Sequence, residues 1–162
     1  MRTMHGNPIT VLGKELKLGD KAPEFTLVDT SLNKKKLSDF EKEYVLLSVV
    51  PSLDTGVCDL QTRTINEKLA SFSNVDFVTV SMDLPFAQKR WCGSAGLEIV
   101  TLSDYMTGDF GVSYGVLIEE VRLLARSVFV LNKNREVIYV EYLSEMTNHP
   151  NYDKLIEFLN QL

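Results

Sequence analysis

The chain contains 162 residues with a mass of 18.3 kDa, a length typical of one compact domain, so we expect residues 1–162 to form a single domain. Apolar residues make up 44% and charged residues 24% of the sequence, a composition that excludes extended disorder. The net charge of −5 excludes the basic surface of a nucleic-acid-binding protein, and no apolar run approaches the ~18–20 residues of a membrane-spanning helix.

Short strands and turns are predicted for the first forty residues. Residues 9–17 contain two short apolar segments around Gly13, and we expect a small hairpin there with Gly13 in its turn. Residues 25–28 form another apolar segment bounded by turn-forming residues, and this segment is expected to be a strand. The three consecutive lysines at 34–36 are interpreted as part of a solvated hairpin rather than as a phosphate site.

Two apolar runs rich in β-branched residues follow, at residues 44–50 and 75–81. Such runs are typical of strands that are covered on both faces in an α/β sheet. Between them, apolar residues recur three and four positions apart over residues 56–72, which predicts an amphipathic helix. A strand, a helix and a strand of these lengths predict a right-handed βαβ unit.

The C-terminal third predicts a hairpin and a closing helix. A third apolar run at residues 127–131 leads into residues 136–142, which alternate between apolar and polar side chains and indicate an antiparallel partner strand. An apolar stripe from Tyr152 onwards predicts the last helix, with Pro150 near its start. The expected fold class is therefore α/β, with a mixed central sheet and helices on both faces.

Cys58 lies where the first buried strand meets the first helix, which is the end of the strands where open α/β sheets bind ligands. Unpaired N–H groups and the helix dipole favour an anion in the first turn, and therefore a thiolate. Thr55 can present its hydroxyl to the same pocket or simply cap the helix. Pro51 can shield the sulfur or simply end the strand.

The residues alone leave two interpretations of Cys58 open. Cys58 precedes Ile65 by seven residues and Leu69 by eleven, which places it on the buried face of the helix. A lone cysteine in that place is often a small core residue, and a reactive thiol there needs compensating donors or positive charge. Residues 1–13 show no signal-peptide pattern, so we expect a reducing cytoplasmic location, where permanent disulfides are rare.

The segment Pro51-Ser52-Leu53-Asp54-Thr55-Gly56-Val57-Cys58 resembles the active-site loop of the peroxiredoxins, in which a proline and a threonine precede the cysteine. Residues 83–92 (DLPFAQKRWC) resemble the resolving-cysteine helix of the thiol peroxidase branch, also called atypical two-cysteine peroxiredoxins. Residues 6–8, 102–104 and 115–126 are also similar to family segments, so the resemblance covers nearly the whole chain. It implies a thioredoxin-like fold with an N-terminal β-hairpin.

The resemblance implies a thioredoxin-dependent peroxidase that reduces hydrogen peroxide and organic hydroperoxides. Cys58 would be the peroxidatic cysteine, and Cys92 the resolving cysteine that forms an intramolecular disulfide with it before thioredoxin reduces the bridge. Thr55 would orient the peroxide, Pro51 would keep water from the sulfur, and Arg126 would stabilise negative charge. The family likeness also implies a homodimer and no bound cofactor.

Two of these assignments carry further expectations. Arg126 has an alternative role as a surface ion pair with Glu119 or Glu120. Cys92 is expected at the end of a short helix stopped by Gly93, and because disulfide formation needs close Cα atoms, we expect this segment to unwind during turnover.

Other classes of site lack their characteristic residues. The two histidines, His5 and His149, have no metal-ligand spacing, and neither a phosphate-binding nor a dinucleotide motif is present, so no metal or cofactor is expected. A dithiol oxidoreductase of thioredoxin fold is disfavoured because there is no C-x-x-C. A non-enzymatic redox sensor that uses the same disulfide stays open, and it would oxidise stoichiometrically but turn over poorly.

Overall fold

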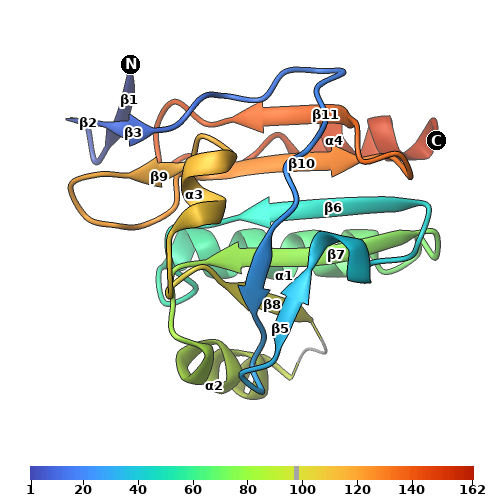
Figure 1. Cartoon of the computed structure of the whole chain (residues 1–162), viewed down its shortest axis with the longest axis horizontal. Helices are drawn as coiled ribbons and strands as arrows, with labels where there is room; N and C mark the ends of the chain where they lie inside the picture. The colour runs from blue at the N-terminus through green and yellow to red at the C-terminus, as the bar shows by residue number, and fades with distance from the viewer. Residues whose placement is uncertain (97–98) are drawn as a thin grey trace.

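The computed structural model describes residues 1–96 and 99–162, and a seven-stranded mixed sheet forms its centre (Figure 1). The strand order is β11-β10-β6-β7-β8-β4-β5, with β6, β7 and β8 parallel and the other neighbours antiparallel. The strands are β4 (Thr26–Val28), β5 (Lys34–Lys36), β6 (Tyr44–Val49), β7 (Val75–Ser81), β8 (Val100–Ser103), β10 (Ser127–Leu131) and β11 (Val137–Tyr142). The predicted buried strands, the βαβ unit and the lysine hairpin are thus confirmed.

Helices lie on both faces of this sheet, as predicted. The helices are η1 (Leu37–Asp39, 3-10), α1 (Gly56–Leu69), α2 (Pro85–Ala95), α3 (Asp109–Ser113) and α4 (Tyr152–Asn160). Helices α1 and α4 pack together with Leu46 and Val128 on one face, whereas α3 covers the opposite face. No helix within the described part of the chain is both long and apolar enough to cross a bilayer.

Helix α1 is shorter than predicted. It ends at Leu69 rather than Phe72, because Ala70 caps it and the Phe72 N–H donates to the Leu69 carbonyl in a turn. Phe72 nevertheless packs against the cluster that Ile65 and Leu69 help to form, so the predicted apolar face extends past the helix end.

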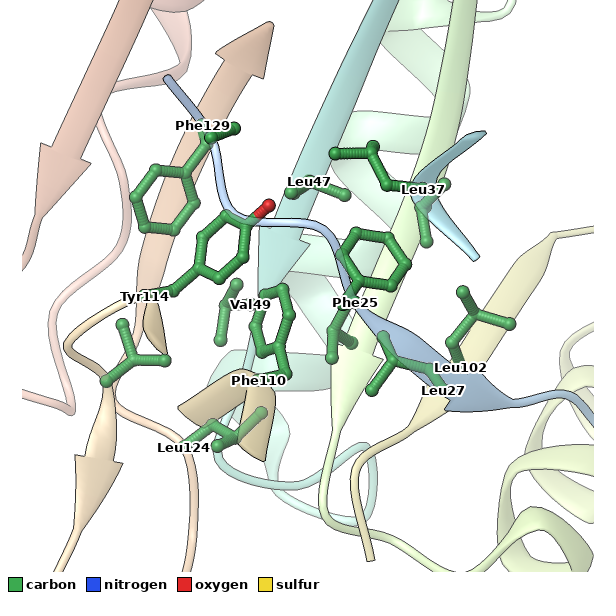
Figure 2. Close-up of a cluster of buried hydrophobic side chains, with 14 of the residues drawn as sticks. Phe25, Leu27, Leu37, Leu47, Val49, Leu102, Phe110, Tyr114, Leu124 and Phe129 are labelled. Atoms are coloured by element: carbon green, nitrogen blue, oxygen red, sulfur yellow. The ribbon is translucent and has the colours of Figure 1, made fainter. Parts of the chain in front are cut away.

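An aromatic cluster fixes α3 against the sheet (Figure 2). The Phe110 ring stacks on Tyr114 with 4.2 Å between centroids, and Tyr114 meets Phe129 of β10 edge-on at 5.4 Å. The Tyr114 hydroxyl donates a 2.7 Å hydrogen bond to the Pro23 carbonyl, which satisfies the polar end of this buried ring. The core on this side of the sheet therefore holds α3 and the N-terminal segment in one place.

The N-terminal β-hairpin exists, but not at the predicted residues 9–17. It is formed by β1 (Arg2–Met4) and β2 (Asn7–Ile9), and the turn residues His5 and Gly6 both have positive φ, +50° and +79°. Positive φ at both central positions is the geometry of a tight hairpin turn, which glycine favours. The turn of the N-terminal hairpin therefore contains Gly6 rather than Gly13.

Residues 11–12 pair with a distant segment instead of folding back on residues 15–17. Strand β3 (Val11–Leu12) is antiparallel to β9 (Leu117–Ile118). Gly13, with φ +88°, lies so close to α3 that a Cβ there would be 1.9 Å from the Val112 carbonyl oxygen. The glycine thus permits a close approach between segments rather than a hairpin turn.

The carboxylate of Glu145 fastens the N-terminal hairpin to the segment after β11. It accepts hydrogen bonds from the N–H groups of His5 (3.0 Å) and Gly6 (3.2 Å), and from the hydroxyls of Thr3 and Thr147. These bonds, that of Thr3 foremost, lower the pKa of Glu145 from 4.5 to about 2. Because the folded-state pKa is the lower one, the stabilisation is complete above the unfolded value and is lost as the pH falls towards 2.

We therefore expect Glu145→Gln to remove a pH-dependent part of the stability. The thermal midpoint of the wild type should exceed that of the variant by a constant amount above about pH 5, and the difference should shrink between about pH 4.5 and pH 2. Thermal unfolding of both proteins, followed by circular dichroism across this range, measures the difference. A difference in thermal midpoint that stays constant down to about pH 2 would contradict the lowered pKa of Glu145.

Candidate active site

The loop between β6 and α1 places Cys58 in the first turn of the helix, as predicted. The first helical hydrogen bond of α1 runs from the Asp59 N–H to the Thr55 carbonyl at 2.9 Å. The N–H groups of residues 56–58 therefore precede the helical hydrogen-bond ladder and form the positive end of the helix dipole. Cys58 is 0% exposed, so its sulfur is shielded from water although Thr55 and Gly56 at the start of the helix are exposed.

The side chain of Arg126 meets the Cys58 sulfur directly. Its Nη2 lies 3.0 Å from Cys58 Sγ, Nη1 donates to Gln61 Oε1 at 2.7 Å, and Nε donates to the Met146 carbonyl at 2.8 Å. Arg126 is only 2% exposed and directly precedes β10. The planar guanidinium is thus fixed by three partners, and its positive charge is directed at the sulfur.

The alternative surface role of Arg126 is wrong. A side chain that is buried beside Cys58 cannot form an ion pair with the exposed Glu119 or Glu120. Glu120 instead accepts hydrogen bonds from the Thr10 N–H, at 2.9 and 3.0 Å.

Gln61 and Met146 hold the arginine, and sequence reasoning missed both. Gln61 lies three residues after Cys58 on the buried face of α1, and its Nε2 donates to Ser48 Oγ of β6 at 2.8 Å. The sequence did contain a signal for Gln61, because a polar residue on the apolar face of a helix needs a buried hydrogen-bond partner. Met146, in the segment after β11, offered none, although its carbonyl accepts from Arg126 Nε and its Sδ accepts from the Arg126 backbone N–H at 3.2 Å.

Pro51 and Thr55 both lie in the loop that covers Cys58. Pro51 is buried, whereas Thr55 is exposed and occupies the N-cap position of α1. The Thr55 hydroxyl donates to the Ser52 carbonyl at 3.1 Å rather than to the sulfur. Because Cys58 has no exposed surface, an oxidant reaches it only when side chains of this loop shift.

Cys92 faces β8 in this conformation. Its Sγ lies 3.8 Å from Thr101 Oγ1, and the two cysteines are free thiols rather than a disulfide. Burial raises the pKa of the Cys92 thiol, an effect that the Thr101 hydrogen bond partly opposes. Cys92 nonetheless packs against the small apolar cluster that contains Cys58 and Trp91. The fold thus brings the two cysteine-bearing segments together without joining the sulfurs.

Helix α2 continues beyond the predicted stop at Gly93. It ends at Ala95, and the capping residue is Gly96, whose φ of +66° is left-handed. The Gly96 N–H donates to the carbonyls of Cys92 and Gly93, an arrangement that closes the last turn. Cys92 therefore lies within the last turns of α2 rather than at its end.

Asp83 ties the active-site loop to the start of α2, and sequence reasoning missed this residue too. Its carboxylate accepts hydrogen bonds from the Ser52 hydroxyl (2.7 Å), the Leu53 N–H (2.8 Å) and the Ser81 hydroxyl (2.8 Å). Asp83 lies two residues before Pro85, the first residue of α2. The loop before Cys58 and the helix that carries Cys92 are therefore anchored at a shared carboxylate.

The Tyr152 hydroxyl lies 3.2 Å from His149 Nδ1, and its phenol is within electrostatic range of the same site. Burial raises the pKa of Tyr152 to about 12, and the positive charge of Arg126 opposes this shift while Cys58 adds to it. Tyr152 is the first residue of α4. The start of the last helix thus lies within electrostatic reach of the sulfur and the guanidinium.

Comparison with known proteins relates nearly the whole chain to one family. Residues 17–156 match the Redoxin family model. A thiol peroxidase of Halalkalibacterium halodurans is 60% identical over 96% of this chain and 94% of the relative. A thiol peroxidase of Bacillus subtilis strain 168 is 54% identical over 96% of this chain and 93% of the relative.

The fold is also similar to solved structures. A peroxiredoxin-like protein from Aquifex aeolicus is 41% identical, has a TM-score of 0.92, and is matched over 99% of this chain and 95% of its own. This likeness confirms the expected thioredoxin-like architecture of a mixed sheet flanked by helices.

Proposed function

The chain belongs to the thiol peroxidases of the Redoxin family, and on this premise we propose that Cys58 reduces hydrogen peroxide and organic hydroperoxides. The observation that carries the proposal is the buried 3.0 Å contact between Arg126 Nη2 and Cys58 Sγ at the N-terminus of α1. A guanidinium and a positive helix end both favour a thiolate. The same groups can stabilise negative charge on the departing oxygen.

In the first step the Cys58 thiolate attacks one peroxide oxygen in line with the O–O bond. A sulfur–oxygen bond forms and the O–O bond breaks, so that the sulfur is oxidised to a sulfenic acid. The alkoxide or hydroxide that leaves takes up a proton from solvent and becomes an alcohol or water. Pro51 keeps water from the sulfur, and Thr55 orients the peroxide once the loop admits it.

In the second step the Cys92 sulfur attacks the sulfenic sulfur of Cys58. The disulfide forms as water leaves, and an external dithiol then reduces the bridge by thiol exchange. Thioredoxin is the dithiol that the family resemblance implies. Part of α2 must move for this step, because Cys92 faces Thr101 in the present conformation.

We also propose a homodimer with its interface beside the active site. Parallel strands β7 and β8 end at the same edge of the sheet, and exposed apolar side chains follow both: Leu84 and Phe86 are 52% and 68% exposed, and Tyr105 and Met106 are 37% and 61% exposed. A second copy of the chain would cover these side chains. A reducing cytoplasm suits a thioredoxin-dependent cycle of a single domain of this kind.

The test is hydroperoxide consumption in the presence of thioredoxin and its reductase. The wild type should turn over, Cys58→Ser should lose all activity, and Cys92→Ser should complete one peroxide turnover and then accumulate sulfinic acid at Cys58. Mass analysis without reductant should show loss of two hydrogens within one chain. Stoichiometric oxidation without turnover would indicate a sensor, and a bridge found only between chains would refute the intramolecular scheme.

A further inference from the structure

A hydrogen bond joins the two cysteine-bearing helices at the residues that neighbour the cysteines. Asp59 directly follows Cys58 on α1, and Trp91 directly precedes Cys92 on α2. The indole Nε1–H of Trp91 donates to Asp59 Oδ1 at 2.7 Å. An acceptor that carries a full negative charge makes this bond stronger than a bond between neutral groups.

Arg63 completes the contact from the next turn of α1. Its Nε donates to the other carboxylate oxygen, Asp59 Oδ2, at 2.9 Å. Its guanidinium carbon lies 5.5 Å from the centre of the Trp91 ring, a distance at which cation and ring attract each other. Trp91 is 8% exposed. We refer to Asp59, Arg63 and Trp91 as the α1–α2 latch.

The latch is closed in the conformation that cannot form the disulfide. Cys58 contacts Arg126 and Cys92 contacts Thr101, whereas the two sulfurs of a disulfide lie about 2 Å apart. Bringing Cys92 to Cys58 displaces the end of α2, and Trp91 moves with its neighbour. Because Trp91 and Cys92 are adjacent in α2, a displacement that carries Cys92 to Cys58 would strain or break the Trp91–Asp59 hydrogen bond.

We propose that the α1–α2 latch positions Cys92 away from Cys58 and thereby sets the rate at which the sulfenic acid is resolved. This inference rests on the proposed function, because it concerns the second step of that cycle. A closed latch prolongs the lifetime of the sulfenic acid, which leaves time for a second peroxide to oxidise it to sulfinic acid. A weakened latch speeds disulfide formation and protects Cys58.

The decisive variant is Asp59→Asn, which keeps the shape of the side chain but removes its charge. Losing a charge-assisted hydrogen bond shifts an opening equilibrium by roughly tenfold. After one equivalent of hydrogen peroxide, rapid quenching and mass analysis should show the Cys58–Cys92 bridge forming roughly tenfold faster than in the wild type. The sulfinic fraction at excess peroxide should fall accordingly.

Two further variants separate the latch from general electrostatic effects. Arg63→Met keeps the Asp59 charge beside Cys58 and should also speed bridge formation, but by less. Arg90→Met is the matched control, since Arg90 lies next to Trp91 but pairs with Asp54 only through an exposed contact at 3.4 Å. Its bridge should form at the wild-type rate.

A second measurement needs no peroxide. The chain contains one tryptophan, so acrylamide quenching of the fluorescence of the reduced protein reports the exposure of Trp91 alone. Asp59→Asn should increase the quenching constant, and Arg90→Met should not. Equal quenching and equal bridge formation in Asp59→Asn and the wild type would overturn the latch, whereas a wild type that forms no bridge would overturn the disulfide mechanism itself.

Discussion

Replacing Arg126 with methionine is expected to slow the reaction of Cys58 with hydrogen peroxide by about 10²–10³-fold, the loss typical of removing one preorganised donor to a developing charge. Arg126 Nη2 lies 3.0 Å from the sulfur, and the guanidinium that faces it is buried. Methionine fills much of the volume but supplies no charge. Stopped-flow measurement of the first oxidation, in single turnover, isolates this step from reduction by thioredoxin.

The controls distinguish loss of charge from loss of structure. Arg126→Lys keeps the charge but cannot reach Cys58, Gln61 and Met146 at once, so it should recover only part of the rate. Arg90→Met removes an exposed guanidinium near the same loop and should react like the wild type. Thermal unfolding shows whether Arg126→Met is folded. A folded variant that reacts at the wild-type rate would contradict the role assigned to this arginine.

The sequence predicted the position of Cys58 but not the contacts that hold Arg126 and the active-site loop beside it. The end of a buried strand and the helical period together place a sulfur in the first turn of α1, since both signals are local. Gln61 and Asp83 join segments that are distant in the chain, and their contacts with Arg126 and Ser52 depend on how β10 and α2 pack. Arg126 itself was assigned by family resemblance, because no local pattern distinguishes a buried arginine from a surface one.

The fold shows the same contrast between local sequence signals and contacts that depend on distant segments. Strand β10 is fully buried and strands β6 and β7 are mostly buried, so their sequences are mainly apolar and rich in β-branched residues, which predicts them directly. Strand β3 has only two residues, and its partner β9 follows more than one hundred residues later. Its pairing is decided by tertiary packing, which is why a local interpretation assigned the adjacent Gly13 to a hairpin turn.

Gly13→Ala is expected to destabilise the protein by about 2–5 kcal/mol. A left-handed φ costs a non-glycine residue about 1–2 kcal/mol, and this cost alone would apply if Gly13 merely formed a turn. The close approach adds a second cost, because the new Cβ would lie 1.9 Å from the Val112 oxygen and 2.9 Å from its carbonyl carbon. Backbone atoms must then move, and such overpacking costs about 1–3 kcal/mol more.

Gly19→Ala separates the two costs. Gly19 has a φ of +90°, almost the same as the +88° of Gly13, but no atom of the described residues lies within 4 Å of the position of its Cβ. At about 2–4 °C per kcal/mol, Gly19→Ala should lower the thermal midpoint by about 4 °C and Gly13→Ala by about 10 °C. Equal decreases in the thermal midpoint would mean that Gly13 does not pack tightly against α3. Gly13 would then be interpreted as a turn residue only. A larger loss at Gly13 would show that β3, α3 and β9 are held in one tight contact, on the face of the sheet opposite to the helix that carries Cys58.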